Sequence, residues 1–508
     1  MPRKNSVSPK TSNEKISNAV DGVKNDHIIS KVFVLYTGGT FGMAPNRAVP
    51  GHPLEPLELE DLEDALPEAS ELAPGVDVTL ERFSRLLDSS SMTPDDWINI
   101  ARKIEENYED HDGFIILQGT DTLAYTASAL SFMLENLAKP VIITGSQLPL
   151  TNARTDANLN YGHALQIAGF KATDLPRIPE VIVVFADKVL RGCRTRKMSA
   201  SAWTGFDTPN CPPLGEIGEH VRIFESQIRP APPVGLDLQV HTELNPDVLD
   251  ISLYPGLRAS HLNQILNLDE VKGVVFRTYG TGNAPEDADF LAALGDGISN
   301  GDKVVVNITQ CPQGAVEMGL YAASVGLIDN GVISGLDMTP EAALTKLMVT
   351  MGTRIGEQVK LQMQISQRGE QSQNLFDFNF KKTDKPIDAP YSDFIVPDRR
   401  FDPTVLSAAV LRMKGVNVTI EDGAEQGVID LYMNFPNPKI DLIARDSHPR
   451  RLHRIELSES GVFNVVEQLP KEKVKNIIGD SDVVLTFVPS PGVTFSFEKL
   501  SLSMFTRA

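Results

Sequence analysis

Cysteine, metal-ligand patterns and long apolar segments are scarce or absent in this 508-residue sequence. The three cysteines, Cys193, Cys211 and Cys311, show no Cys-x-x-Cys spacing, which fits a reducing compartment and offers no disulfide framework. No stretch is long and apolar enough to predict a membrane span, and the polar residues 1–28 lack the apolar core of a secretory signal. The nine histidines show no metal-ligand spacing. We therefore expect a cytosolic protein without a metal or other cofactor.

Positive charge is also in short supply. Lysine and arginine number 47 against 67 aspartates and glutamates, a formal net charge of −20. This balance argues against nucleic acid or an anionic membrane as the main partner, because both are themselves negatively charged. The 41% hydrophobic and 22% charged residues are ordinary for a soluble globular protein. The length predicts two or three domains with sizeable cores.

A short motif near the start, Thr37-Gly38-Gly39-Thr40, follows a run of β-branched and aromatic residues. The run at 32–36 is typical of a buried strand. The paired glycines permit backbone angles and close approaches that a Cβ would block. Thr40 would then present its hydroxyl at the C-terminal end of a strand, where open α/β sheets hold their ligands. Taken alone, the motif is equally consistent with a tight turn that carries an incidental threonine.

Strands and helices alternate along most of the chain. The predicted strands of a first unit are 32–36, 76–83, 113–117, 141–143 and 181–185, with helices from 93 to about 108, from 123 to 137 and from about 156. Such alternation predicts a parallel sheet wound by helices on both faces. Strands at 273–276 and 304–308, with helices near 286–294, 315–327 and 340–352, predict a second α/β unit.

Changes in composition predict the domain boundaries. They give 1–28 as a disordered segment, 29–224 as the first α/β domain, 225–245 as a proline-rich linker, 246–370 as the second α/β domain, 371–390 as a polar linker and 391–508 as a β-rich tail. The tail shows strand-like runs at 483–488 and 493–497 around a Pro-Ser-Pro-Gly turn, a pattern that predicts a hairpin. It carries no catalytic signature, and we predict no role for it.

Three predicted strand ends of the first domain carry hydroxyl and acidic groups. Thr40, Ser89 and the pair Thr120-Asp121 lie there, and a basic segment that ends in Lys197 follows a later strand. A threonine nucleophile needs a base, a lysine can serve as that base, and a neighbouring acid can orient the lysine. Glycines before each threonine leave N–H groups free to stabilise an oxyanion. Taken singly, Asp121 is explained as a helix cap and Lys197 as a solvated surface residue.

The motifs Thr37–Thr40 and Gly119–Thr122 resemble those of the cytosolic (type I) L-asparaginases, a module also found in the asparaginase/lysophospholipase proteins of animals. Further stretches that resemble the family are 128–137, 253–256, 280–285, 309–311 and 337–339, so the resemblance covers residues 31 to 370. It implies a two-domain fold, with a larger doubly wound N-terminal sheet and a smaller C-terminal α/β unit. It also implies hydrolysis of L-asparagine to L-aspartate and ammonia by a homodimer or homotetramer.

The resemblance also implies roles for single residues. Thr40 would form a covalent aspartyl ester, and Thr120, Asp121 and Lys197 would move protons and assist deacylation. Substrate contacts are expected from Ser89, Ser90, Gly119, Thr120 and Asp121, with Ser89 at the α-carboxylate and Asp121 at the α-amino group. Which threonine attacks first stays open. So does the preference for asparagine over glutamine, because a pocket discriminates one methylene by only about 1–3 kcal/mol.

Some positions depart from the family pattern. Gln118 stands where the family has histidine, Ser91 where it has aspartate, and residues 41–56, the expected lid, lack the tyrosine of bacterial relatives. Bacterial type I enzymes also have a second, regulatory asparagine site. The residues that match its pattern are Arg277, Asn283, Thr309 and Cys311. Arg196 replaces the small threonine beside the lysine, so its bulk could block or rewire that site.

Other functions compete with asparagine hydrolysis. A lysophospholipase of the serine type needs a Gly-x-Ser-x-Gly elbow between a strand and a helix, and the match at 297–301 has the reverse order. An amidotransferase subunit that acts on charged tRNA shares the module, but the acidic balance argues against tRNA contact. Dinucleotide binding lacks its glycine spacing at 38–42. A catalytically weak binding module is disfavoured because all four predicted catalytic side chains are present.

Overall fold

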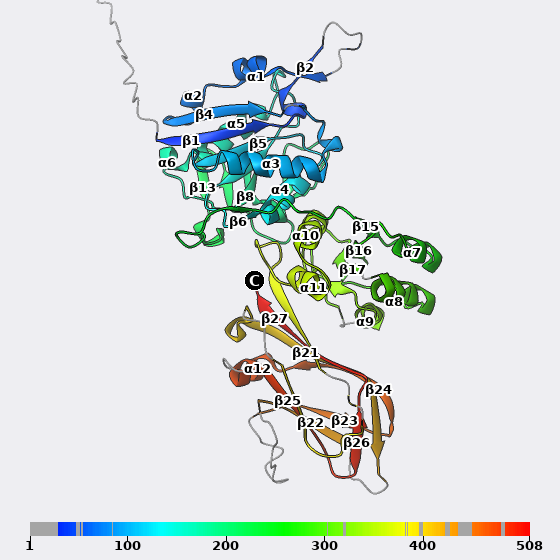
Figure 1. The fold of residues 1–508 in the computed structure, drawn as a ribbon. Coiled ribbons are helices and arrows are strands. Elements are labelled where there is room, and N and C mark those ends of the chain that lie inside the picture. Colours follow the sequence, from blue (N-terminus) through cyan, green and yellow to red (C-terminus); the bar gives the residue numbers. More distant parts are fainter. Residues whose placement is uncertain are drawn as a thin grey trace, which may run out of the picture.

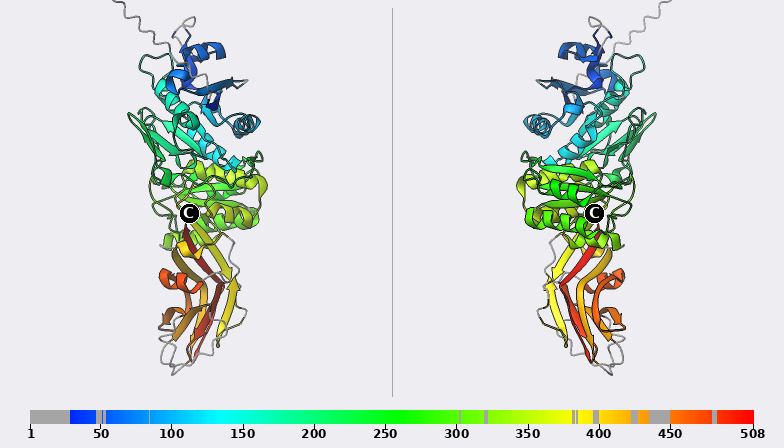
Figure 2. Two further views of the ribbon diagram at one scale, coloured as in Figure 1. Left: turned by 90° about the vertical axis from the view of Figure 1, so that its left-hand side faces the viewer. Right: turned by 90° about the vertical axis from the view of Figure 1, so that its right-hand side faces the viewer.

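The computed structural model arranges the chain as an N-terminal α/β unit, a smaller α/β unit and a β-rich tail (Figure 1). Two further views show the three parts in a row (Figure 2). The structure describes residues 29–46, 51, 54–83, 85–301, 303–318, 322–380, 383, 385–395, 400–421, 427–434, 450–478 and 483–508. The predicted disordered segment 1–28 and part of the expected lid at 41–56 lie outside the described residues.

An eight-stranded sheet forms the centre of the N-terminal unit, in the order β13-β12-β9-β8-β7-β5-β1-β4. The parallel strands are β1 (Ser30–Tyr36), β4 (Val76–Arg82), β5 (Gly113–Leu117), β7 (Val141–Thr144) and β8 (Val181–Phe185). β5, β7 and β8 are buried along their whole length because apolar clusters cover both faces of the sheet. The predicted fold class is thereby confirmed.

One edge of this sheet differs from the prediction of an all-parallel arrangement. Strands β9 (Lys188–Arg191), β12 (Gly215–Ile217) and β13 (Val221–Ile223) are antiparallel to their neighbours. β9 follows β8 through the two residues Ala186 and Asp187, and Ala186 has a φ of 53°. So short a connection joins antiparallel strands only, because a parallel pair needs a crossover of a dozen or more residues.

Helices cover both faces of the N-terminal sheet. They are α1 (Leu59–Ala65), α2 (Ala69–Leu72), α3 (Pro94–Glu106), α4 (Leu123–Met133), α5 (Ala157–Ala168) and α6 (Phe170–Thr173). α3 begins as predicted, with a capping box between Thr93 and Asp96 and with Pro94 in its first turn. α4 ends before the predicted Leu137, because residues 134–135 form β6 (Leu134–Glu135), which pairs with β14 (Gln239–Val240).

The second unit is built on a four-stranded parallel sheet. Its strands are β15 (Val248–Ser252), β16 (Gly273–Thr278), β17 (Val304–Thr309) and β18 (Ile333–Ser334), and its helices are α7 (Ala259–Leu266), α8 (Ala288–Gly301), α9 (Ala322–Asp329), α10 (Pro340–Thr353) and α11 (Glu357–Gln364). One apolar cluster joins the two units, since Leu130 of α4 and Leu347 of α10 belong to it together with Val306. No described helix is long and apolar enough to cross a membrane.

The tail consists of two β-sheets around a common apolar cluster. One sheet contains β19 (Gln373–Phe380), β27 (Lys499–Arg507), β21 (Leu406–Ile420), β24 (Gly461–Leu469) and β26 (Val493–Ser496). The other contains β20 (Tyr391–Ile395), β25 (Val483–Pro489), β22 (Gly427–Met433) and β23 (Arg451–Leu457). The helix α12 (Lys471–Ile478) contributes Val474 and Ile478 to the cluster.

Two predictions about the tail are wrong. The expected linker 371–390 contains β19, which pairs with β27 along its whole length; its outward Asp377 and Asn379 give the segment its polar composition. The expected hairpin is absent, because β25 pairs with β20 and β22 whereas β26 pairs with β21. The turn between them crosses from one sheet to the other. Phe487 and Phe495 then pack together with ring centroids 6.0 Å apart.

Candidate active site

The predicted site begins where three neighbouring parallel strands end. Thr40 follows β1, Ser89 follows β4 after a short loop, and Thr120 follows β5. The strands lie side by side in the order β5-β1-β4, so their C-terminal ends share one edge of the sheet. The three hydroxyl-bearing residues therefore lie at that edge.

Three glycines bring these strand ends into contact. A Cβ on Gly39 would lie 2.3 Å from the Cα of Gly119, and a Cβ on Gly38 would lie 2.2 Å from the carbonyl oxygen of Leu87. A Cβ on Gly119 would lie 2.6 Å from Ser89 Oγ. Gly38 and Gly39 also have φ angles of 120° and 87°, which side chains disfavour. The close approach of the segments that bear Thr40 and Thr120 thus depends on glycine.

Lys197 reaches this edge from the short strand β10 (Arg196–Lys197), which pairs with β11 (Phe206–Asp207). Its Nζ donates to Thr120 Oγ1 at 2.9 Å and to Asp121 Oδ1 at 2.7 Å. The Lys197 side chain is 20% exposed and that of Asp121 is 64% exposed. Asp121 is no helix cap, since Thr122 is the N-cap of α4. A hydroxyl, an amine and a carboxylate in contact can pass protons.

Ser89 connects the loop after β4 with the turn after β5. Its Oγ accepts a hydrogen bond from the backbone N of Asp121 at 3.2 Å, and its carbonyl oxygen accepts one from Thr122 Oγ1 at 2.7 Å. Asp88 accepts from the backbone N of Ser90 at 2.9 Å, and this bond lowers the pKa of the Asp88 carboxyl. Ser89 is buried and Ser90 is exposed, so only the second offers its side chain to solvent.

Gln118, one of the departures from the family pattern, lies buried below the strand ends. Its Nε2 donates to Thr126 Oγ1 at 2.9 Å, and the same hydroxyl oxygen accepts from Trp97 Nε1 at 3.1 Å. The Gln118 side chain therefore links β5 to α4 and, through Trp97, to α3. This arrangement gives the residue a structural role beneath the site.

The segment after Thr40 is described only in part. Its described residues include β2 (Met43–Pro45) and β3 (Leu54–Pro56), which pair in antiparallel fashion. Tyr36, at the end of β1, is fully buried, and burial raises the pKa of its hydroxyl far above the usual value. A Cβ on Gly42 would lie 2.5 Å from that hydroxyl, so Tyr36 supports the turn from inside.

A group of residues that the sequence did not predict holds the segment leading to Lys197. Arg194 is buried and its Nη1 donates to Asp337 Oδ2 at 2.9 Å. Ser372 Oγ donates to the same carboxylate oxygen at 2.6 Å, and the carbonyl oxygen of Ser372 accepts from the backbone N of Ala508 at 3.1 Å. Figure 1 shows β27 running from the tail to this junction. Both α/β units and the tail therefore meet behind Lys197.

Three of the predicted regulatory residues lie at the ends of β16 and β17. Thr309 Oγ1 donates to the carbonyl oxygen of Gly280 at 2.6 Å and accepts from the backbone N of Cys311 at 3.0 Å. Asn283 Oδ1 is buried without a hydrogen-bond partner among the described residues. The Cys311 residue is exposed and its thiol is free.

Arg277, the fourth, belongs to a charged layer between the two α/β units. Its Nε lies 2.8 Å from Asp250 Oδ1, and Arg196 Nε lies 3.7 Å from Glu341 Oε1. Glu341 is buried and burial raises the pKa of its carboxyl, while its Oε2 has no hydrogen-bond partner among the described residues. Tyr125 lies within reach of all four charges, and burial raises the pKa of its hydroxyl. Arg196 therefore enters the same layer as Arg277.

The serine-lipase alternative has no structural counterpart in the described residues. Gly297 to Gly301 form the last residues of α8, so Ser299 lies in a helix and not on a strand-to-helix elbow. Within the described ranges, no group of three or more His, Cys, Asp and Glu side chains could hold a metal ion.

Comparison with known proteins gives two matching family models. "Asparaginase, N-terminal" matches residues 31–229, and "Glutaminase/Asparaginase C-terminal domain" matches residues 247–362. L-asparaginase 1 of Escherichia coli (strain K12) is 43% identical over 344 residues, which cover 67% of this chain and 97% of that protein. The 60 kDa lysophospholipase of Mus musculus is 39% identical over 340 residues, which cover 63% of this chain and 58% of that protein.

A solved structure is similar as well. The crystal structure of L-asparaginase I from Vibrio cholerae O1 biovar eltor str. N16961 superposes with a TM-score of 0.60 and 39% identity, and covers 68% of this chain and 99% of that one. The matched models end at residue 362, before β19 begins. The tail is therefore an addition to the matched module.

Proposed function

Since this chain belongs to the asparaginase family, a family of amidohydrolases, we propose that it hydrolyses L-asparagine to L-aspartate and ammonia. One observation carries the proposal. Lys197 Nζ contacts both Thr120 Oγ1, at 2.9 Å, and Asp121 Oδ1, at 2.7 Å, at the sheet edge where Thr40 lies. An amine between a hydroxyl and a carboxylate suits the proton transfers of amide hydrolysis.

In the proposed first step, Thr40 Oγ attacks the carbon of the substrate side-chain amide. The Thr40 proton passes to a base, the amide nitrogen takes up a proton, and the C–N bond breaks. Ammonia leaves and an ester joins the aspartyl group to Thr40. Backbone N–H groups at the touching glycines Gly39 and Gly119 would stabilise the negative charge that develops on the carbonyl oxygen.

In the second step, water hydrolyses this ester. A neutral Lys197 amine takes a proton from Thr120, and Thr120 takes one from the attacking water. The carboxylate of Asp121 holds the ammonium that forms. The bond between the aspartyl carbon and Thr40 Oγ breaks, Thr40 regains a proton, and aspartate leaves.

Substrate recognition follows the same proposal. Ser89, Ser90, Gly119, Thr120 and Asp121 would contact the substrate, with Ser89 at the α-carboxylate. Asp121 accepts the α-amino group, which its high exposure allows. Ser89 is anchored by its bonds to Asp121 and Thr122, so its position depends on the turn after β5.

Ammonia release from L-asparagine tests the proposal. Wild type, Thr40→Ala, Thr120→Ala and the matched control Thr419→Ala, an exposed residue of the tail, would be compared. We expect release by wild type and control and loss by two orders of magnitude or more in the other two, as is typical of lost nucleophile or base catalysis. Peptide masses after rapid quenching would identify the acylated threonine. Equal rates in wild type and Thr40→Ala would contradict the assignment of Thr40 as the nucleophile. No ammonia release by any of the four proteins would favour a binding module.

A lysophospholipase-type esterase is the second candidate, raised by the 39% identity to the mouse protein. The helical position of Ser299 offers no support for a serine mechanism at that residue. Fatty-acid release from lysophosphatidylcholine by wild type, abolished in Thr40→Ala, would establish esterase activity at the same site. The absence of release would remove this candidate.

We propose that Arg277, Asn283, Thr309 and Cys311 form a second, regulatory asparagine site, with Arg196 as the residue that alters it. The charged layer of Arg196, Glu341, Arg277 and Asp250 supports the link to Lys197, which follows Arg196 directly. Sigmoidal velocity curves in wild type are expected to change in Arg196→Thr. Hyperbolic curves in both proteins would contradict regulation.

The proposed assembly is a homodimer or homotetramer in the cytosol, with sites between paired subunits. Light scattering after size-exclusion chromatography measures the mass of the assembly directly. A monomer with full activity would contradict the proposal.

A further inference from the structure

A cavity of about 150 Å³ lies behind the segment that leads to Lys197, away from the proposed reaction. Its lining includes three arginines, Arg191, Arg229 and Arg368, and a single carboxylate, Glu180. The prolines that follow Arg229 form part of its wall. This space is large enough for a tetrahedral ion such as phosphate.

The carboxylate in the lining already has its partners. Arg191 donates from Nε to Glu180 Oε2 at 2.6 Å and from Nη2 to Glu180 Oε1 at 3.1 Å. The backbone N of Arg229 donates to Oε1 at 2.8 Å. Both side chains of the pair are buried. This bidentate ion pair is strong, and the charge of Arg191 balances that of Glu180.

The other two arginines have no such partner. Arg229 Nη2 and Arg368 Nη1 both donate to the carbonyl oxygen of Gln367, at 2.9 and 3.1 Å, and Arg368 Nε donates to the carbonyl oxygen of Ser131 at 3.0 Å. Neither forms an ion pair with a carboxylate among the described residues. Two guanidinium groups bonded to one oxygen are close neighbours. Burial lowers the pKa of Arg368, and the positive charge of Arg229 lowers it further.

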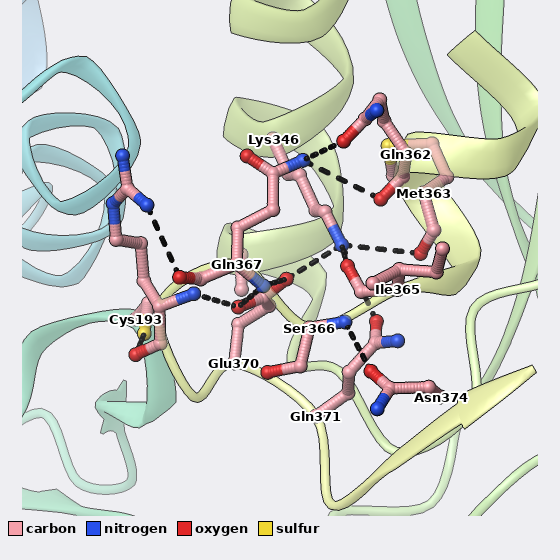
Figure 3. Close-up of polar contacts among 12 residues, drawn as sticks. Cys193, Lys346, Gln362, Met363, Ile365, Ser366, Gln367, Glu370, Gln371 and Asn374 are labelled. Atoms are coloured by element: carbon pink, nitrogen blue, oxygen red, sulfur yellow. Dashed lines mark hydrogen bonds and ion pairs between the residues drawn. The ribbon is translucent and has the colours of Figure 1, made fainter. Parts of the chain in front are cut away.

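Nearby carboxylates do not neutralise this pair of arginines. Figure 3 shows Glu370 facing Lys346, with Lys346 Nζ 2.5 Å from Glu370 Oε1 and both side chains fully buried. Glu135 Oε2 lies 2.6 Å from His241 Nε2. Even with His241 neutral, the surroundings hold one cation more than carboxylates: Arg191, Arg229, Arg368 and Lys346 against Glu135, Glu180 and Glu370.

We propose that the cavity binds a small oxyanion, inorganic phosphate or the phosphoryl group of a metabolite, between Arg229 and Arg368. Like charges held close together in a partly buried place repel each other, and an anion between them turns that repulsion into attraction. Guanidinium groups also match the oxygen spacing of phosphate better than lysine does. Arg191 and Cys193 line the same cavity and belong to the segment that leads to Lys197. The bound ion therefore links the loop of Gln367 to that segment.

Calorimetric titration with inorganic phosphate at constant ionic strength tests the site. Wild type, Arg229→Gln, Arg368→Gln and the control Arg258→Gln, an exposed arginine before α7, would be compared. We expect saturable binding by wild type and control, and binding at least about tenfold weaker in each of the other two. Arg368→Lys, which keeps the charge but loses the planar fork, is expected to bind with intermediate affinity. Heats no greater than those of sodium chloride in wild type would overturn the proposal.

Thermal unfolding without phosphate separates an anion site from a merely structural cluster. Removing one of two repelling cations should offset the loss of the Arg368 hydrogen bonds to Ser131 and Gln367, so the midpoint of Arg368→Gln should lie close to that of wild type. Only wild type should gain stability when phosphate is added. A lower midpoint in Arg368→Gln, with no phosphate effect in wild type, would overturn the site. Phenyl phosphate distinguishes the sources: binding as tight as that of phosphate indicates a phosphorylated metabolite, and exclusion indicates the free ion.

Discussion

The segment 191–197 lies between two surroundings that differ in exposure to solvent, a front at Lys197 and a rear behind Arg194. At its front, Lys197 and Asp121 are in contact with each other and with solvent, and the Asp121 side chain is 64% exposed. At its rear, Arg194 is buried against Asp337, and beyond it Lys346 and Glu370 pair with no exposed surface at all. Exposed charges can change partners and protons at little cost, whereas buried pairs cannot be separated without a large penalty. The front is thus suited to chemistry, and the rear to holding a position.

The largest expected effect is a loss of activity caused by a substitution at the front. Lys197→Met removes the amine between Thr120 and Asp121, so ammonia release should fall by about 10²–10⁴, the range of lost general acid–base catalysis. Stability to urea should change little, because the side chain is partly exposed. Thr419→Ala serves as the control. A fall in stability that matches the fall in activity would contradict the assigned division between front and rear.

The rear should show the opposite behaviour. Lys346→Met leaves Glu370 buried without its cation, and we expect a loss of about 3–5 kcal/mol in the free energy of unfolding. Urea unfolding followed by circular dichroism measures it. The double variant Lys346→Met/Glu370→Leu should recover part of the loss, because no charge is then left unpaired, although the backbone N–H groups of Gln367 and Arg368 lose their acceptor. Equal stability of the two variants would show that the pair is not coupled.

Acid should weaken the rear through protonation of Glu370. The Lys346 ammonium and the backbone N–H groups of Gln367 and Arg368 outweigh burial and hold the pKa of Glu370 at about 2, below its ordinary value of 4.5. The folded pKa is the lower one, so this stabilisation is complete above about pH 4.5 and is lost as the pH falls toward 2. The amount is at most about 3 kcal/mol. Unfolding free energies of wild type should therefore fall more steeply over this range than those of the double variant.

The smallest effect concerns the link between rear and tail. Ser372→Ala removes two hydrogen bonds, the one from its hydroxyl to Asp337 and the one that it accepts from Arg194, while Arg194 still donates to Asp337, so the expected loss is about 1–2 kcal/mol. The Michaelis constant should stay unchanged while the turnover number falls slightly, because the loss concerns the position of Lys197 and not a substrate contact. Ser201→Ala, an exposed loop serine, is the control. A changed Michaelis constant with an unchanged turnover number would argue against a positioning role.

The front could be predicted from the sequence because its determinants are local. Strand, glycine turn and hydroxyl follow one another within a few residues at Thr40 and Thr120, and parallel strands bring such ends to one edge. Lys197 also contacts Thr120 and Asp121, over 77 and 76 positions, and this contact followed from the family resemblance and not from a local pattern. The roles assigned to these residues remain predictions.

The rear could not be predicted in this way. The bond between Arg194 and Asp337 spans 143 positions, and that between Arg194 and Gly369 spans 175. The residues involved have no periodicity or motif that connects them, and the polar composition around Ser372 resembled a linker. The same reason explains the missed strand β19: its polar face looks like a loop until its partner, β27, is known. Pairing between distant segments is a property of the folded chain.

The pairing of β19 with β27 has a consequence for the order of events during synthesis. β19 ends at residue 380 and β27 begins at residue 499. At about 5–20 residues per second, β19 leaves the ribosome roughly ten seconds before its partner strand is complete. For that time Phe376 and Phe378, buried in the finished sheet, have no neighbour along this edge. A nascent chain of this protein therefore carries an unpaired strand beside two completed α/β units. Such a strand is a target for chaperones and can pair with another nascent chain.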